Sequence, residues 1–208
     1  MDDLRVHSAR REFRKLAAVA LFASAISAVG CHDGLTWTLE ALPVLLLAPL
    51  AWIVAAPPSR LLGRTLLLHA LVLLVGAHWT YAEVPAGRTV AQWLGQERNP
   101  YDRLGHLMQG LTPALLVREW IVRTGAVRTA GLGAAFAVSA ALAFSALYEL
   151  FEWLAAAVIG QSAEAFLGTQ GFAWDTQADM LCALVGALAA VLLLGRPHLS
   201  SVARLQPA

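Results

Sequence analysis

Charged residues are scarce in this sequence, and that scarcity excludes most soluble folds. Only 14% of the 208 residues are Asp, Glu, Lys or Arg, whereas 58% are hydrophobic. A soluble domain has about 25% charged residues. The composition is typical of a protein that crosses a lipid bilayer several times. We therefore predict an all-α, polytopic membrane protein that forms one integral membrane domain over residues 1–208.

Other absences narrow the range of functions. The net charge is only +1, so no basic stripe is available to bind nucleic acid. The two cysteines, Cys31 and Cys182, indicate neither a disulfide nor a thiolate metal site. The sequence has no internal repeat, no low-complexity tract and no motif for a nucleophilic Ser or Cys. A hydrolysis or transfer reaction would therefore proceed without a covalent intermediate.

Long apolar runs are abundant. A helix that spans the bilayer needs about 20 mostly apolar residues. By this criterion we predict a bundle of about six transmembrane helices, at residues 16–31, 38–56, 62–82, 101–121, 130–158 and 176–195. The last two ranges carry small residues that favour close packing between helices: Gly131, Gly133, Ala137, Ala141, Ala183, Gly186, Ala187 and Ala190.

The distribution of Lys and Arg predicts the orientation, because loops on the cytoplasmic side carry an excess of both. With the N-terminus in the cytoplasm, only Arg88, Arg98 and Arg103 lie outside, so 12 of the 15 basic residues lie inside. Acidic residues show the opposite bias, since 10 of the 14 then fall in outer loops or the outer parts of spans. We predict that both termini are cytoplasmic.

Three predicted spans each carry a pair of ionisable residues near the outer surface. A spacing of three or four residues puts both members of a pair on one helix face. Ionisable groups inside spans are costly and normally face a partner or a water-filled cavity. The pairs are Asp102 with His106, Glu149 with Glu152, and Asp175 with Asp179. We predict that all six meet in one outer-leaflet site.

The charge of this predicted site requires compensation. Its five carboxylates would repel one another if all were ionised, unless protons, Arg103 or a bound cation offset them. Oxygen ligands with one imidazole suit Mg²⁺, Mn²⁺ or Ca²⁺, and also Zn²⁺. We predict His106, Glu149, Asp175 and Asp179 as metal ligands, and the full set of six as candidates for acid–base catalysis.

Neighbouring polar and aromatic residues extend the predicted site. The loop "FLGTQGFAWDTQ" is too apolar for an ordinary solvent loop and could form a lid at the membrane surface. Candidate substrate-binding residues are Gln109, Gln170, Trp174 and Gln177. Two further residues on other spans, Glu40 and His78, could join the cluster, whereas His69 is interpreted as structural or pore-lining.

The motifs "ERNPYDRLGHLMQG", "YELFEW" and "GTQGFAWDTQADM" resemble those of the YjdF-like bacterial inner-membrane proteins, a family of unknown function. The stretches "WTLEALP" and "YAEVPAG" fit the same pattern, so the resemblance covers nearly the whole chain. It implies a bacterial inner-membrane location. A fainter similarity links Asp102, His106, Glu149 or Glu152, and Asp175 or Asp179 to VanZ-like membrane proteins, although Glu152 stands where an amide is expected.

Three interpretations of the acidic site remain open. The first is an outward-facing membrane enzyme, metal-assisted, acting on a lipid or lipid-linked envelope substrate. The second is an ion- or proton-coupled transporter that uses the same carboxylates, although the chain lacks the inverted repeat of many transporters. The third is a non-enzymatic membrane subunit in which the acids connect three helices.

Overall fold

The computed structural model describes residues 2–159 and 170–205, and all regular secondary structure in these ranges is helical. The long helices are α1 (Asp2–Ala28), α2 (Gly34–Leu47), α3 (Arg60–Trp79), α5 (Tyr101–Thr124), α6 (Ala130–Ile159) and α8 (Asp175–Leu192). The short ones are η1 (Ala48–Trp52), η2 (Tyr81–Glu83), α4 (Pro85–Trp93) and α9 (Gly195–Ala203). The all-α fold predicted from composition is therefore confirmed.

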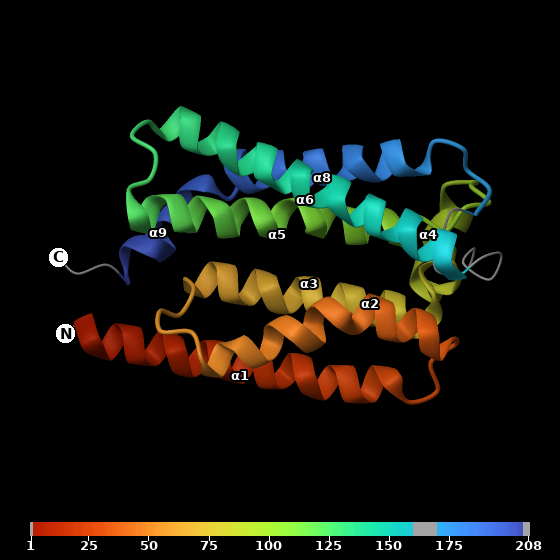
Figure 1. Cartoon of the computed structure of the whole chain (residues 1–208), viewed down its shortest axis with the longest axis horizontal. Helices are drawn as coiled ribbons and strands as arrows, with labels where there is room; N and C mark the ends of the chain where they lie inside the picture. Colours follow the sequence, from red (N-terminus) through yellow and green to blue (C-terminus); the bar gives the residue numbers. More distant parts are fainter. Residues whose placement is uncertain (1, 160–169, 206–208) are drawn as a thin grey trace.

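The long helices run up and down along one axis (Figure 1). The first half of the bundle contains α1, α2 and α3, and the second contains α5, α6 and α8, with α3 packing on α5 to join them. Both ends of the described chain lie at one end of the bundle, beside α9. The η2–α4 segment lies at the other end. We call these the terminal end and the distal end.

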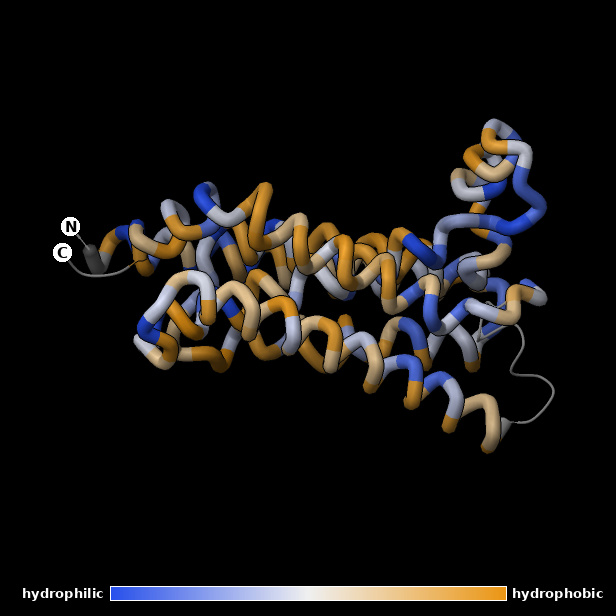
Figure 2. The backbone as a smooth tube through the Cα atoms, turned by 90° about the horizontal axis from the view of Figure 1, so that it is seen from above, coloured by the Kyte–Doolittle hydropathy of each residue, from blue (hydrophilic) through white to orange (hydrophobic). Residues whose placement is uncertain are grey.

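Within residues 2–159 and 170–205, four helical segments are long and apolar enough to cross a membrane: Gly34–Trp52, Arg60–Trp79, Ala130–Val158 and Asp175–Leu192. They overlap four of the predicted spans, and Figure 2 shows apolar residues along the middle of the bundle. The first half of α1 is rich in Lys and Arg, and α5 buries polar side chains such as His106 and Glu119. The Lys and Arg residues of α1 and the buried polar residues of α5 lower the mean hydropathy of these two helices. The total of six spans stays a prediction.

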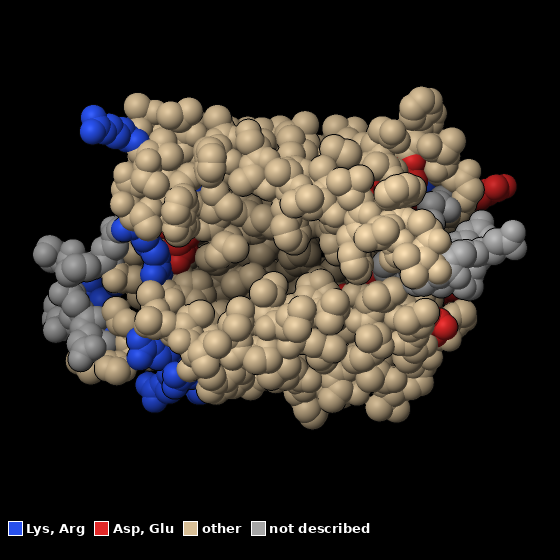
Figure 3. All heavy atoms as spheres, in the orientation of Figure 1, with Lys and Arg blue, Asp and Glu red and all other residues tan. Residues whose placement is uncertain are grey.

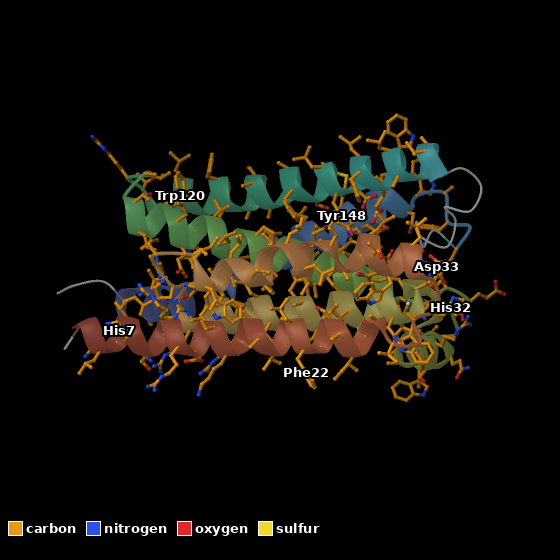
Figure 4. All side chains as sticks on the ribbon, turned by 60° about the horizontal axis from the view of Figure 1, so that its bottom comes forward. His7, Phe22, His32, Asp33, Trp120 and Tyr148 are labelled. Carbon is orange, nitrogen blue, oxygen red and sulfur yellow. The ribbon has the colours of Figure 1, made fainter. Side chains whose placement is uncertain are left out.

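The surface of the middle of the bundle is apolar. Phe22 is 68% exposed on α1 and points away from the helices (Figure 4). Leu147 on α6 is 65% exposed, and Val185 on α8 is 51% exposed. Side chains of this kind are stable in contact with lipid tails, where exposure of apolar area carries no hydrophobic penalty.

Glycines let α5 and α8 approach closely. A Cβ atom at Gly110 of α5 would lie 1.8 Å from the carbonyl oxygen of Ala183, and one at Gly186 of α8 would lie 2.0 Å from that of Leu107. Neither backbone can accommodate a side chain at these points. The contact extends from there toward the distal end, so it sets the distance between polar residues on the two helices.

Charges separate along the bundle axis. In Figure 3, Lys and Arg gather at the terminal end, and most of the visible Asp and Glu lie at the distal end. This separation matches the charge bias on which the predicted orientation depends. At the distal end, the carboxylate of Asp33 caps α2 by accepting a hydrogen bond from the Thr36 N–H at 2.7 Å, which holds the pKa of Asp33 below its usual value.

Candidate functional site

Three side chains of metal-ligand type form a triad between α5 and α8 at the distal end. Asp102, His106 and Asp179 are all buried, and one ligand atom from each lies within 4.8 Å of those of the other two. The close approach at Gly110 and Gly186 brings Asp179 to this position. The Oδ1 atom of Asp179 is buried and has no hydrogen-bond partner among the described residues. Buried polar atoms are normally paired, so this oxygen is available to a ligand.

The orientation of His106 suits metal binding. Its Nδ1 lies 2.8 Å from Oε1 of Gln109, and its Nε2 lies 3.6 Å from Oδ1 of Asp102. With the Gln109 oxygen as acceptor, Nδ1 carries the proton and Nε2 presents its lone pair toward Asp102. A metal-bound histidine normally has a hydrogen-bonded partner for its other nitrogen. Gln109 supplies that partner in this protein.

Arg98 offsets part of the negative charge. Its guanidinium lies 3.4 Å from Oδ2 of Asp102 and also forms an ion pair with Asp175. The sequence analysis considered protons, Arg103 or a bound cation for this role. Arg103 also lies at this end, near Phe172, whose ring centroid is 5.9 Å from the Arg103 guanidinium and 5.5 Å from that of Arg98. Phe172 thus covers the ion pair from the loop before α8.

A small cavity adjoins the triad. Its volume is about 20 Å³, and its lining includes Asp102 and His106 together with five other polar side chains, which are Glu40, Tyr81, Gln109, Tyr148 and Glu152. A water molecule needs at least about 10–15 Å³ and several polar partners. The cavity therefore has room for one water molecule beside the triad.

Helices distant in sequence supply the cavity wall. Glu40 of α2 is buried and accepts a hydrogen bond from the Tyr148 hydroxyl of α6 at 3.2 Å. Figure 4 shows Tyr148 between the helices. The Tyr81 ring fits because Gly76 and Gly105 lack side chains, since a Cβ at these positions would lie 2.4 Å and 3.2 Å from it. The first half of the bundle thus completes the site.

Asn99 holds the start of α5 in place. Its side chain donates to the carbonyl oxygens of Ala82 and Val84 at 3.0 and 2.9 Å, and accepts from the Tyr101 N–H at 3.0 Å. Gly87 makes room, because a Cβ there would lie 1.9 Å from the Asn99 amide oxygen. The sequence analysis missed Asn99, for which the only signal was an Asn–Pro turn before Asp102.

Comparisons with known proteins identify the family. Residues 13–200 match the family described as "Predicted membrane protein (DUF2238)". The chain belongs to this family. It is 49% identical over 178 residues to "Inner membrane protein YjdF" of Escherichia coli (strain K12), which covers 85% of each chain. No solved structure matches it. The predicted resemblance to the YjdF-like family is confirmed, whereas similarity to VanZ-like proteins stays a prediction.

The other predicted acids of this DUF2238 protein lie at different distances from the triad. Glu149 has a side chain 9% exposed and lies 3.6 Å from Nδ1 of His106. Asp175 pairs with Arg98, and Glu152 lines the cavity. All six predicted residues therefore gather at the distal end of the bundle, but only Asp102, His106 and Asp179 form the close triad.

The predicted substrate-binding residues separate into two groups. Gln109 is buried against His106. The Gln170 side chain instead accepts a hydrogen bond from the Asn99 N–H at 2.8 Å and donates one to the Asn99 carbonyl oxygen at 3.1 Å. Trp174 and Gln177 are exposed. Phe166, Leu167 and Gly168 of the predicted lid lie outside the described residues. His78 does not join the cluster, because its Nδ1 lies 2.8 Å from the Ser27 carbonyl oxygen.

A second polar cluster lies at the terminal end, and the sequence analysis missed it. Glu119 of α5 accepts from the Ser59 N–H at 2.8 Å and lies 2.7 Å from Arg123 and 3.1 Å from Nε2 of His198. Both Glu119 oxygens are thus paired. Glu119 is buried, and His198 is fully buried. The cluster connects α5, the N-terminus of α3, and α9.

Proposed function

We propose that this DUF2238 protein is a metal-assisted membrane enzyme that acts on a lipid or lipid-linked envelope substrate from the outer side of the bacterial inner membrane. The observation that carries the proposal is the buried triad of Asp102, His106 and Asp179, with ligand atoms within 4.8 Å of one another. Two carboxylates and one imidazole suit a divalent ion such as Mn²⁺ or Zn²⁺, and an all-oxygen site would suit Mg²⁺ or Ca²⁺ better.

The proposed chemistry is hydrolysis or transfer of an ester or phosphoester. When bound, the ion would supply Lewis acidity and activate water. The residues of the chain would orient the ligands and accept the proton. Gln109 orients His106 through the bond at 2.8 Å. Glu152, which lines the cavity with Asp102 and His106, can accept the proton of the reacting water, and Glu149, whose Oε1 lies 3.6 Å from Nδ1 of His106, flanks the imidazole. The cavity of about 20 Å³ can hold the reacting water.

The proposed orientation has both termini in the cytoplasm and six spans in one domain. It is supported by the gathering of Lys and Arg at the terminal end (Figure 3). The polar faces of α5 are covered by neighbouring helices, since α5 packs on α3, α6 and α8. A helix with buried polar residues can cross the bilayer in such a position despite its low hydropathy.

The first experiment is the metal content of the purified full-length protein. We expect about one divalent ion per chain in the wild type and in Asp33→Asn, which removes an exposed carboxylate at the same end. We expect loss of the ion in Asp179→Asn at equal yield. A folded wild type that binds neither Mn²⁺ nor Zn²⁺ on titration would contradict the metal site.

The second experiment tests the reaction. Lipid extracts from cells that produce the wild type are compared with extracts from cells that produce Glu149→Gln or Asp179→Asn. We expect a lipid or lipid-linked species to be consumed by the wild type and to accumulate with both variants. Identical extracts in all three strains would count against the enzyme.

A non-enzymatic membrane subunit is the second candidate. The small volume of the cavity favours it, because about 20 Å³ leaves no room for a substrate. In this interpretation the acids connect α5, α6 and α8, and a metal ion or protons stabilise the cluster. Transport is supported less well. A core of Leu62, Ala114, Leu115, Ala141, Ala187 and Ala190 lies between the levels of His106 and Glu119 along α5.

A further inference from the structure

A basic groove lies at the terminal end, away from the triad. Its larger part, about 550 Å³, runs between α3 and α9 and is lined by Arg60, Arg64 and Arg204. A neighbouring hollow of about 400 Å³ shares Arg60 and Arg204 with it and adds Arg5 of α1. Together they bring four guanidinium groups, from α1, α3 and the C-cap of α9, to one surface. We call this surface the basic groove.

The positive charge of the basic groove is only partly compensated. Glu12 of α1 pairs with Arg60 at 3.2 Å and with Arg64 at 2.8 Å, and Arg60 also donates to the Ser8 hydroxyl at 2.9 Å. Among the residues that the structure describes, Glu12 is the one carboxylate paired with these arginines. These contacts hold Arg60 and Arg64 in position while the surface remains cationic, as a site for an anion requires.

The wall of the groove is apolar. Its lining includes Leu61, Leu68, Leu194 and Pro197. Leu68 is 54% exposed and lies two turns along α3 from Arg60, which corresponds to about 12 Å at 1.5 Å per residue. The groove therefore has a cationic rim at the end of the bundle and an apolar wall that runs toward its middle.

Hydroxyl groups add donors at the rim. Ser200 and Ser201 line the groove, as does Thr65, whose hydroxyl already donates to the Leu61 carbonyl oxygen at 3.0 Å. Ser201 accepts a hydrogen bond from the Leu61 N–H at 3.2 Å, which leaves its own hydroxyl proton available to donate. Arginine and hydroxyl donors together are the usual partners of a phosphate group.

We propose that the basic groove binds an anionic phospholipid of the bilayer, with its phosphate at Arg60, Arg64 and Arg204 and an acyl chain along Leu61 and Leu68. The apolar wall selects a lipid over free phosphate, because a free anion gains nothing from it. Basic pockets between helices near the membrane surface bind anionic headgroups in this way. The proposal is independent of the triad and of any reaction there.

The test is native mass spectrometry of the full-length protein in detergent with added phosphatidylglycerol. We expect Arg204→Gln to weaken binding roughly fivefold, as one surface arginine does, and Arg204→Lys to retain most of it. Arg204 is exposed, so its substitution leaves the buried core unchanged. Arg64→Gln should act in the same direction.

The matched control is Arg11→Gln. Arg11 is exposed at the same end on α1, but it does not line the basic groove. Binding should stay within about twofold of the wild type. An equal loss with Arg11→Gln would reveal attraction by overall charge and overturn the site. Equal binding of phosphatidylcholine, or displacement of phosphatidylglycerol by millimolar inorganic phosphate, would also overturn it.

Discussion

The two buried polar clusters on α5 differ in how completely their charges are paired. At the terminal end, Glu119 has partners on both oxygens, from Ser59, Arg123 and His198. At the distal end, Asp102 and Asp179 lie beside one imidazole, and Asp179 Oδ1 has no hydrogen-bond partner among the described residues. A paired buried acid is explained by structure alone. The distal cluster needs protons or a cation to complete it.

The largest expected loss of stability comes from the paired cluster around Glu119 at the terminal end. Glu119→Ala should lower stability by about 3–5 kcal/mol, because it leaves the buried His198 and the half-buried Arg123 without their acid. In thermal unfolding this corresponds to a Tm lower by about 10 °C. Glu12→Gln, which breaks a partly exposed ion pair with Arg60 and Arg64, should change stability by at most about 1 kcal/mol. Equal losses of stability in Glu119→Ala and Glu12→Gln would contradict the distinction between a buried, paired acid and a surface acid.

The next effect concerns the helix contact that brings the distal residues together. Gly186→Ala should reduce stability by about 1–3 kcal/mol, because its Cβ would meet the Leu107 carbonyl and force α8 away from α5. The same displacement should weaken metal binding. Gly133→Ala is the control, since its Cβ would lie at an ordinary 3.5 Å from Ile121. A neutral Gly186→Ala would disprove the role of close packing.

The less completely paired distal cluster should respond in the opposite direction to Glu119. Without metal, Asp179→Asn removes a surplus carboxylate and should raise stability by about 1 kcal/mol. In the presence of saturating Mn²⁺ the wild type should gain stability and the variant should not. Thermal unfolding in chelator and in Mn²⁺ measures both. A large loss of stability of Asp179→Asn in chelator would instead show that Asp179 is a structural acid like Glu119.

The smallest effect tests a distal carboxylate that is already paired. Asp33→Ala should cost about 0.5–1 kcal/mol through loss of the cap on α2. Because the bond from Thr36 lowers the pKa of Asp33 in the folded protein, its contribution is present above the unfolded pKa of about 3.9 and is lost as pH falls through the lower folded value. Unfolding of both proteins at pH 7 and pH 3 measures the difference, and a constant difference would contradict this assignment.

Some features of the site could be predicted because they are local. The pairs Asp102–His106 and Asp175–Asp179 follow from helical periodicity, and both reach the same end of the bundle because the apolar runs set the length of the helices. Glu40 was a candidate from its position on the second predicted span, and it lines the cavity. Arg98 and Asn99 were not found. Arg98 forms one local pair, with Asp102, but its pair with Asp175 and the bonds of Asn99 to Ala82 and Val84 join segments farther apart in the chain.

The sequence by itself determined the all-α fold, the membrane location and the separation of basic from acidic residues, since each depends on composition and on the spacing of residues within one helix. Only the tertiary structure decided which acids are paired. That outcome depends on how each helix is rotated and how closely it approaches its neighbour. Gly110 and Gly186 set that approach for α5 and α8, which brings Asp179 beside His106, while α9 brings His198 to Glu119.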